Sequence, residues 1–192
     1  MLIFDEVICG FGRTGKAFGA QSFGVTPDMM TLAKALTNGA QPMGGVAVRQ
    51  PIHDAILDAA PDGAVEFFHG YTWSGHPAAC AAALATLDIF EREDLFARAA
   101  LLAPEFLDRL AEFGATEGVL DVRGIGLFGA VDVEPIAGRP GARGTELAWR
   151  LFDAGLHLKF TGDTALLGPP LVAQTQDLDR LFEILGDTLA RG

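Results

Sequence analysis

Short apolar runs alternate with glycine-rich turns through the first fifty residues of the chain. One run covers residues 1–4 and ends where Asp5 brings in charge, and a second covers residues 29–33 and ends at Lys34. Apolar runs of this length, bounded by turn residues, are typical of buried parallel strands. Because the ends of two such strands can face one cleft, we predict that an acid, Asp5, and an amine, Lys34, lie at a common site.

The pattern continues with a third short strand within residues 43–48 and a helix that begins at Gln50-Pro51. After a loop at 61–77, Pro77 is predicted to be the first residue of an alanine-rich helix. The composition becomes charged around residues 91–94, so we place a domain boundary between residues 1–93 and 94–192.

The second half is predicted to be a small α+β domain. Its first helix carries apolar residues at helical spacing from Leu95 to Phe113, with Pro104 kinking or splitting it. A second helix is expected to begin with Thr145 as its cap and to close at Gly155. The remaining expected elements are strands at 119–122, 127–133, 156–160 and 165–167 and an amphipathic helix over 178–189.

Composition narrows the class of protein. The chain has 192 residues, 49% of them apolar, which suits a soluble globular enzyme. Its net charge of −11 argues against nucleic acid and against an anionic membrane as partners. Cys9 and Cys80 are too few for a disulfide framework, and with neither a signal sequence nor a membrane span the expected location is the cytoplasm. His69 and His76 lack metal-ligand spacing with a third donor, so no metal site is expected.

The chain begins inside the first apolar run. A buried strand needs neighbours on both sides to satisfy its backbone, so we expect that an N-terminal half is missing. The glycines of residues 10–15 read G-x-G-x-x-G, the form of a dinucleotide-binding fingerprint. That fingerprint requires an immediate helix and a later acid at a second strand end, so a tight loop is the favoured interpretation and a dinucleotide site the weaker alternative.

Two hydroxyls, Thr72 and Ser74, lie just upstream of the helix that Pro77 begins. The N-terminus of a helix offers free N–H groups and a positive dipole end, which suit a phosphate. The alternative is that both hydroxyls only cap the turn. Pyridoxal phosphate needs a lysine for its Schiff base, a carboxylate for its pyridine nitrogen and a phosphate site, and Lys34, Asp5 and Thr72 offer one of each.

Three stretches of the chain resemble the signatures of one enzyme family. The strings FDEVICGFGRTG, PDMMTLAKALTNGAQPMGGVAV and FFHGYTWSGHPAACAAALATLDI are similar to those of class III pyridoxal-phosphate-dependent aminotransferases, in the same order, and GDTALLGPPLVA extends the match. The resemblance implies an α/β enzyme of fold type I. It also implies that the chain holds the C-terminal part of a large, mostly parallel-sheet domain, followed by a small α+β domain, and that the enzyme is a homodimer.

The resemblance also assigns roles to residues. It implies that Asp5 pairs with the pyridine nitrogen, that Val7 packs against the ring and that Lys34 forms the Schiff base. It implies that Thr72 reaches the phosphate of the neighbouring subunit's cofactor. The reaction would be a ping-pong transfer of an amino group from a donor to an oxoacid.

The match is strongest to the β-alanine or ω-amino acid:pyruvate branch. Many members of that branch carry an arginine that grips the substrate carboxylate, whereas this chain has Lys159, which provides charge without the bidentate fork. Lys159 is therefore a candidate for substrate binding, with a solvated strand residue as the alternative. An inactive truncated form and a relative with decarboxylase or aminomutase activity also stay open. We expect this piece alone to bind the cofactor weakly or not at all.

Overall fold

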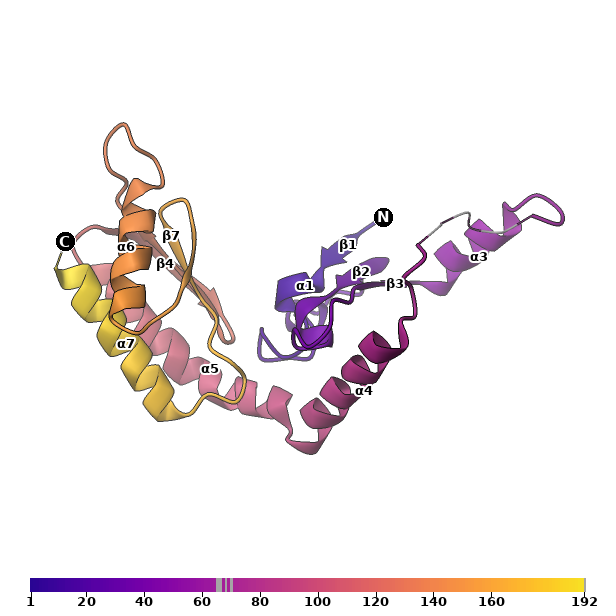
Figure 1. Cartoon of the computed structure of the whole chain (residues 1–192), viewed down its shortest axis with the longest axis horizontal. Coiled ribbons are helices and arrows are strands. Elements are labelled where there is room, and N and C mark those ends of the chain that lie inside the picture. Colours follow the sequence, from indigo (N-terminus) through magenta and orange to yellow (C-terminus); the bar gives the residue numbers. More distant parts are fainter. Residues whose placement is uncertain (65–66, 68, 70, 192) are drawn as a thin grey trace. The chain divides into compact units, whose positions relative to one another are not determined.

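The computed structural model describes residues 1–64, 67, 69 and 71–191. The chain divides into two compact units, coloured along the sequence in Figure 1. Unit 1 comprises Met1–Phe11 and Ala17–Asp94, and unit 2 comprises Gly12–Lys16 and Leu95–Gly192. The boundary expected at residues 93 and 94 concerns the domains of the whole protein and stays a prediction.

Unit 1 contains a three-stranded sheet in the order β1-β2-β3. The strands are β1 (Ile3–Asp5), β2 (Met29–Leu32) and β3 (Gly45–Val48), with β1 parallel and β3 antiparallel to β2. The predicted strands and the parallel pairing of the first two are confirmed. In this chain β1 is an edge strand and Ile3 is 54% exposed, so the burial expected of the first strand stays a prediction for the whole protein.

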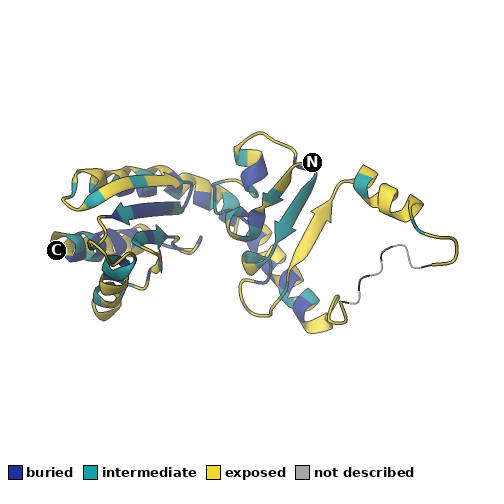
Figure 2. Cartoon of the chain, turned by 90° about the horizontal axis from the view of Figure 1, so that it is seen from above, coloured by how far each residue is buried: buried dark blue, intermediate teal, exposed yellow. Residues whose placement is uncertain are grey.

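The helices of unit 1 are short except for α4. They are α1 (Glu6–Cys9), α2 (Gly19–Ser22), the 3-10 helix η1 (Lys34–Leu36), α3 (Gln50–Asp58) and α4 (Pro77–Arg92). The predicted helix starts at Gln50 and Pro77 are confirmed. Figure 2 shows that β3 and most of α3 are exposed.

The buried residues of unit 1 gather around α4. Ala79, Ala83 and Phe90 are buried on this helix, and the ring of Phe11 stacks on Phe90 with centroids 6.0 Å apart. Phe11 lies in the glycine-rich stretch, where no helix begins between Gly10 and Phe18. The prediction of a tight loop rather than a dinucleotide-binding turn is therefore confirmed.

Unit 2 is built on a four-stranded antiparallel sheet in the order β4-β5-β7-β6. Its strands are β4 (Val119–Ile125), β5 (Phe128–Val133), β6 (Lys159–Thr161) and β7 (Thr164–Leu167). Its helices are α5 (Leu95–Glu112), the 3-10 helix η2 (Phe113–Ala115), α6 (Ala142–Asp153) and α7 (Thr175–Ala190). Within unit 2, α5 packs on β4 and α6 packs on β6, and α7 packs on α5 and α6.

The core of unit 2 lies between its sheet and α5 and α7. Phe106 and Leu110 of α5 are at most 1% exposed, and they lie so close to Gly129 of β5 that a side chain there would collide with Leu110. On α7, Leu178 and Leu185 are equally buried. Small residues in the strand therefore allow the helix to pack directly on the sheet.

Three details of unit 2 differ from the sequence predictions. Of the two effects predicted for Pro104, the split is wrong, because α5 is continuous to Glu112. The strand expected at 156–160 is shorter and shifted, beginning at Lys159. Thr145 is not a helix cap, because α6 begins at Ala142 and the Thr145 hydroxyl donates a hydrogen bond back to the carbonyl oxygen of Gly141.

The cap of α6 comes instead from the turn between β6 and β7. Asp163 accepts hydrogen bonds from the backbone N–H groups of Gly141 (2.7 Å) and Gly144 (2.9 Å), one on each carboxylate oxygen. These two hydrogen bonds hold the pKa of the Asp163 carboxyl below its ordinary value. The helix thus begins three residues earlier than Thr145 because a distant acid satisfies its first N–H groups.

The segment Gly12–Lys16 belongs to unit 2 although its neighbours in sequence belong to unit 1. The Arg13 guanidinium donates to the carbonyl oxygens of Leu127 (3.0 Å) and Pro169 (2.5 Å), and burial lowers the pKa of Arg13. Arg98 similarly donates to the carbonyl oxygens of Leu171 and Ala173. Two arginines therefore fix the segment that follows β7.

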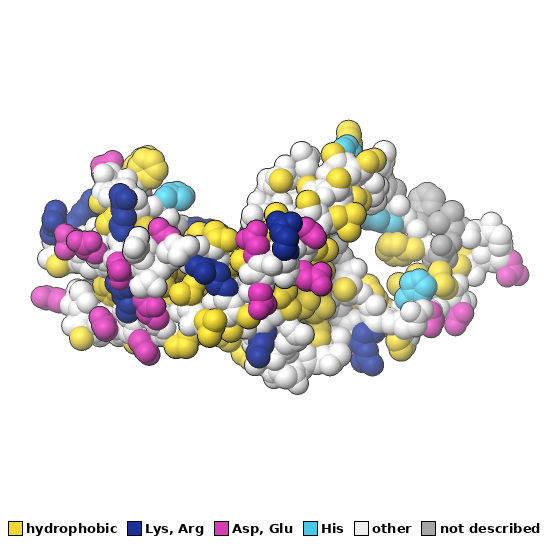
Figure 3. All heavy atoms as spheres, turned by 90° about the horizontal axis from the view of Figure 1, so that it is seen from below, with side chains coloured by type: hydrophobic (Ala, Val, Ile, Leu, Met, Phe, Trp, Pro, Cys, Tyr) yellow, Lys and Arg dark blue, Asp and Glu magenta, His cyan; other side chains and the backbone are white. Residues whose placement is uncertain are grey.

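On the face shown in Figure 3, acidic and basic side chains are interspersed. Within the described part of the chain, no helix is both long and apolar enough to cross a membrane.

Candidate active site

Asp5 is the last residue of β1 and the N-cap of α1. Its parallel neighbour in the register is Thr31 of β2. The carboxylate oxygen Oδ1 of Asp5 accepts hydrogen bonds from the N–H of Val7 and from the hydroxyl of Thr31, both at 3.1 Å. The side chain is nevertheless exposed, so a fixed carboxylate stands at the carboxyl edge of the parallel pair.

The residue after Asp5 faces the opposite way. Glu6 is 1% exposed, and its two carboxylate oxygens accept hydrogen bonds from the N–H groups of Gly19 (2.9 Å) and Ala20 (2.7 Å), the first residues of α2. Glu6 therefore ties α1 to α2 from inside unit 1, while Val7 stays half-buried on α1. The field of Glu6 contributes, after burial, to a raised pKa of the nearby Cys9 thiol.

Lys34 begins η1 two residues after the end of β2, at the same edge of the sheet as Asp5. Its φ is +46°, a left-handed conformation that is unfavourable for any residue with a side chain and recurs at functional sites. Packing of α1 and α4 against η1 supports this turn, and the buried Thr37 hydroxyl donates to the carbonyl oxygen of Gln41 at 2.6 Å. The lysine itself is exposed.

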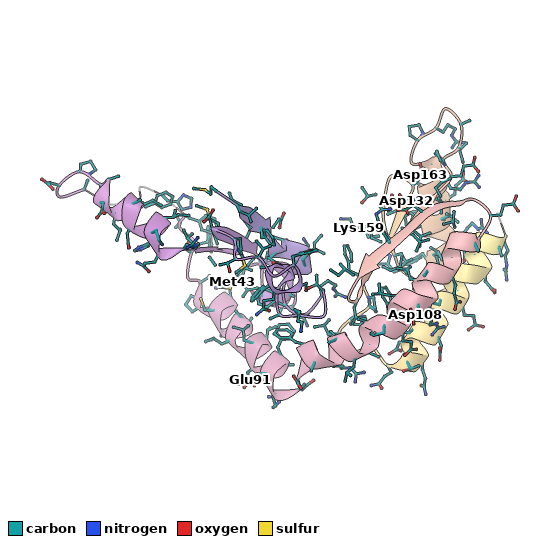
Figure 4. All side chains as sticks on the ribbon, turned by 180° about the vertical axis from the view of Figure 1, so that it is seen from behind. Met43, Glu91, Asp108, Asp132, Lys159 and Asp163 are labelled. Carbon is teal, nitrogen blue, oxygen red and sulfur yellow. The ribbon has the colours of Figure 1, made fainter. Side chains whose placement is uncertain are left out.

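A cavity of about 450 Å³ lies between the loop after η1 and the start of α4. Met43, labelled in Figure 4, lines one side, and Tyr71, Trp73 and His76 line the other. Thr72 lies between two of these lining residues and is exposed. The N-cap of α4 is His76, whose side chain makes no capping hydrogen bond, so the cap residue does not occupy the N–H groups that begin the helix.

Lys159 begins β6 in unit 2. The strand register pairs Thr164 with both Thr161 and Asp132, and Lys159 lies two positions before Thr161 on β6. Lys159 is therefore on the same face of the sheet as Thr164 and Asp132 (Figure 4). On that face Arg123 forms ion pairs with Asp121 (2.6 Å) and Asp132 (2.7 Å).

The two cations on this face of the sheet, Arg123 and Lys159, differ in whether they have acidic partners. The Arg123 and Thr164 hydrogen bonds lower the pKa of Asp132, and the two acids raise the pKa of Arg123. Lys159 is exposed and has no ion-pair partner in the described part of the chain. It is therefore a cation available to an anionic ligand.

These positions meet the needs of pyridoxal phosphate. The parallel strands bring the predicted acid, Asp5, and the predicted amine, Lys34, to one edge, with Val7 on the adjacent helix. Thr72 lies in the same unit, and Lys159 in the other. An exposed carboxylate held by two donors and an exposed lysine at neighbouring strand ends fit the ring nitrogen and the aldehyde of this cofactor.

Comparison with known proteins identifies the family. The model of the class III aminotransferases matches residues 1–189, nearly the whole chain. The chain belongs to the class III aminotransferases. Members of this family depend on pyridoxal phosphate, so the predicted cofactor is confirmed at the level of the family.

The relatives of this aminotransferase chain include enzymes of the predicted branch. It is 47% identical to the ω-aminotransferase of Caulobacter vibrioides over 191 residues, which are 100% of the chain and 43% of that protein. It is 47% identical to the β-alanine–pyruvate aminotransferase of Pseudomonas aeruginosa, with 98% and 42% covered. The predicted likeness to the β-alanine and ω-amino acid branch is thus confirmed.

Solved structures support the predicted fold. A transaminase determined with L-alanine superposes with a TM-score of 0.94 at 33% identity, covering 100% of this chain and 46% of its own. A thermostable (S)-enantioselective ω-transaminase from Thermomicrobium roseum superposes with a TM-score of 0.91 at 38% identity, covering 100% and 43%. The fold is that of fold-type I enzymes, and the chain spans less than half the length of these relatives.

Sequence reasoning missed two residues that organise the candidate site. In the sequence, Glu6 is only part of the charge that follows the first strand. In the structure its buried carboxylate accepts hydrogen bonds from the first N–H groups of α2. Thr31 has the pattern of an ordinary strand residue, yet it contacts Asp5. The parallel pairing predicted for the two strands does not by itself reveal Thr31, because aligning their charged ends would set Asp5 beside Lys34, whereas the observed register sets Asp5 beside Thr31.

Proposed function

We propose that the whole protein carrying this chain is a pyridoxal-phosphate-dependent transaminase. It moves an amino group from a β-alanine-like ω-amino acid or amine to an oxoacid such as pyruvate. The observation that supports this proposal most is the placement of Asp5 and Lys34 at one edge of a parallel strand pair, in a class III aminotransferase chain. Relatives named for the same reaction at 47% identity support the substrate class.

Bound pyridoxal phosphate supplies an aldehyde that binds amines covalently and a ring that accepts the electron pair left on the donor's carbon. In this proposal the Asp5 carboxylate holds the proton on the ring nitrogen, and Val7 packs against the ring. Lys34 would hold the cofactor through its Nζ at the aldehyde carbon, the place that an amino donor would take over. The Nζ released in this way would be the general base that takes the proton from the donor's carbon and the general acid that returns it.

Thr72 is proposed to bind the phosphate of the cofactor in a neighbouring subunit, which makes the protein a homodimer. One feature of unit 1 supports this proposal. The turn that carries Thr72 is exposed together with large apolar rings, since Tyr71 is 63% and Trp73 is 73% exposed. Aromatic residues presented in this way are enriched at protein interfaces.

Lys159 is proposed to bind the donor's carboxylate through a single charged contact. The support is its exposure on a sheet face where the other cation, Arg123, is already paired with two acids. Residues 1–93 are proposed to belong to the large cofactor-binding domain and residues 94–192 to form the small domain. We also propose that the protein acts in the cytoplasm.

The test is a product assay on the purified whole protein. It is mixed with pyridoxal phosphate, pyruvate and one donor from a series of ω-amino acids and simple amines, and alanine is measured. Alanine formed in proportion to the donor consumed is expected, with no alanine from Lys34→Ala. Carbon dioxide release without alanine would indicate a decarboxylase instead, and an isomeric amino acid without pyruvate consumption would indicate an aminomutase.

The chain of 192 residues tested alone gives a second comparison. We expect weak or no cofactor uptake, because its candidate site is exposed and its sheet is open at both edges. Tight stoichiometric uptake by this chain would contradict that expectation.

A further inference from the structure

Thr31 makes a side-chain contact with Asp5 from a different element of unit 1. It lies on β2 directly beside Asp5 in the parallel register, and its Oγ1 donates to Asp5 Oδ1 at 3.1 Å. The strand ends at Leu32, and Lys34 begins η1 two residues later. The hydroxyl therefore connects the acid on β1 to the strand that precedes the amine.

Both hydrogen bonds to Asp5 end on the same oxygen. Val7 N–H and Thr31 Oγ1 both donate to Oδ1, and Oδ2 takes no part in either bond. Two donors from two elements fix the rotation of a carboxylate more firmly than one, because each restricts a different direction of movement. Oδ2 is then the oxygen that a bound ring can meet.

The strand itself does not need this hydroxyl. Valine has nearly the same shape as threonine and an equal preference for strands, so the pairing of β1 with β2 would persist without the oxygen. What would be lost is the tie between the strands at the carboxylate. Val7 would remain as donor, but it lies only two residues from Asp5, in the same turn.

We infer that Thr31 is a positioning residue for Asp5, holding its carboxylate toward the ring nitrogen of pyridoxal phosphate. The inference rests on the proposed function, because it assumes that Asp5 meets that nitrogen. It predicts that the contribution of the Thr31 hydroxyl to cofactor binding depends on the ring nitrogen itself.

The test is a binding cycle on the whole protein. Dissociation constants are measured for pyridoxal phosphate and for an analogue whose ring nitrogen is replaced by C–H, with the parent and with Thr31→Val. For pyridoxal phosphate, Thr31→Val should bind roughly three- to tenfold more weakly, the size expected for one partly exposed hydrogen bond to a charged group. For the analogue, Thr31→Val and the parent should bind equally.

Two further variants separate positioning from general damage. Thr31→Ser keeps the hydroxyl and should bind pyridoxal phosphate like the parent. Thr86→Val is the matched control, because the Thr86 hydroxyl in α4 donates to the Ala82 carbonyl at 2.8 Å rather than to the site. It should affect the two ligands equally.

The outcomes also separate this inference from the proposed function. If reduction with borohydride attaches the cofactor to Lys34 in the parent, but Thr31→Val weakens both ligands equally or neither, the inference fails alone. If Lys34 is not labelled in the parent, the proposed function fails and the inference with it. Should Thr31→Val not fold, Thr31→Ala carries the same cycle.

Discussion

Unit 1 and unit 2 both contain a small sheet, but they differ in where their apolar residues lie. In unit 2, β5 is buried over most of its length and α5 packs on the sheet. In unit 1, all four residues of β3 are exposed, and β1 is an edge strand. The unit that carries Asp5 and Lys34 thus has the more open sheet, whereas unit 2 holds a filled core of its own.

The contrast separates two kinds of sensitivity. Substitutions that empty the core of unit 2 should cost stability, because close-packed side chains relax only partly around a cavity. Substitutions on the open sheet of unit 1 should cost little in this chain. Substitutions at its carboxyl edge should act on cofactor binding instead.

The largest effect is expected from Phe106→Ala. Phe106 is fully buried, so its removal should lower the free energy of unfolding of unit 2 by about 3–5 kcal/mol. Val46 on β3 has a side chain that is 59% exposed, so Val46→Ala should change the free energy of unfolding of unit 1 by less than about 0.5 kcal/mol.

The two tryptophans allow each unit to be followed separately. Trp149 reports urea unfolding of unit 2 in a Trp73→Phe background, and Trp73 reports unit 1 in a Trp149→Phe background. If Val46→Ala lowered the free energy of unfolding as much as Phe106→Ala does, the difference between the two sheets would be contradicted, because β3 would then be buried in solution.

A smaller effect is expected from Lys159→Met. Loss of the charge should raise the KM of the whole protein for β-alanine by roughly three- to tenfold, and it should leave the KM for a simple amine unchanged. Lys159→Arg should keep or lower the KM for β-alanine, because arginine adds a bidentate fork. Arg123→Met is the control, since Arg123 is already paired with Asp121 and Asp132. An equal rise for both donors would contradict a role in carboxylate binding.

The smallest effect is expected from Asp163→Asn. The amide cannot accept both N–H groups at the start of α6, so the melting temperature should fall by roughly 3–8 °C at neutral pH. Because folding lowers the pKa of Asp163, its contribution is present above the ordinary value of 3.8 and is lost as the pH falls through the lower value. The difference between parent and variant should therefore shrink below about pH 4.

Asp108→Asn is the matched control for this prediction. Asp108 is exposed on α5, and the described residues include no hydrogen-bond or ion-pair partner for it (Figure 4). A difference between parent and Asp163→Asn that did not depend on pH would contradict the capping role.

Local patterns predicted much of this fold. The apolar runs gave the parallel strands β1 and β2, and Pro77 marked the first residue of α4 because proline suits that position. The acid and the amine at the two strand ends followed from the same runs. These features depend on neighbouring residues and on the spacing of apolar residues, both of which can be read directly from a sequence.

The features that the sequence did not reveal depend on distant residues. The start of α6 is set by Asp163, which comes about twenty positions later, so Thr145 looked like the cap. Gly12–Lys16 belongs to unit 2 because Arg13 reaches Leu127 and Pro169. No local pattern distinguishes an arginine that binds distant carbonyl groups from a solvated one.

Covalent labelling tests whether Lys34 is the residue that binds the cofactor. The whole protein is incubated with pyridoxal phosphate, reduced with borohydride, digested and mapped by mass spectrometry. Among the three lysines of this chain, Lys16, Lys34 and Lys159, we predict a reduced cofactor on Lys34 alone, with no label at this position in Lys34→Ala. A stoichiometric label on Lys16 or Lys159, or an unlabelled Lys34 in a protein that binds the cofactor, would contradict this prediction.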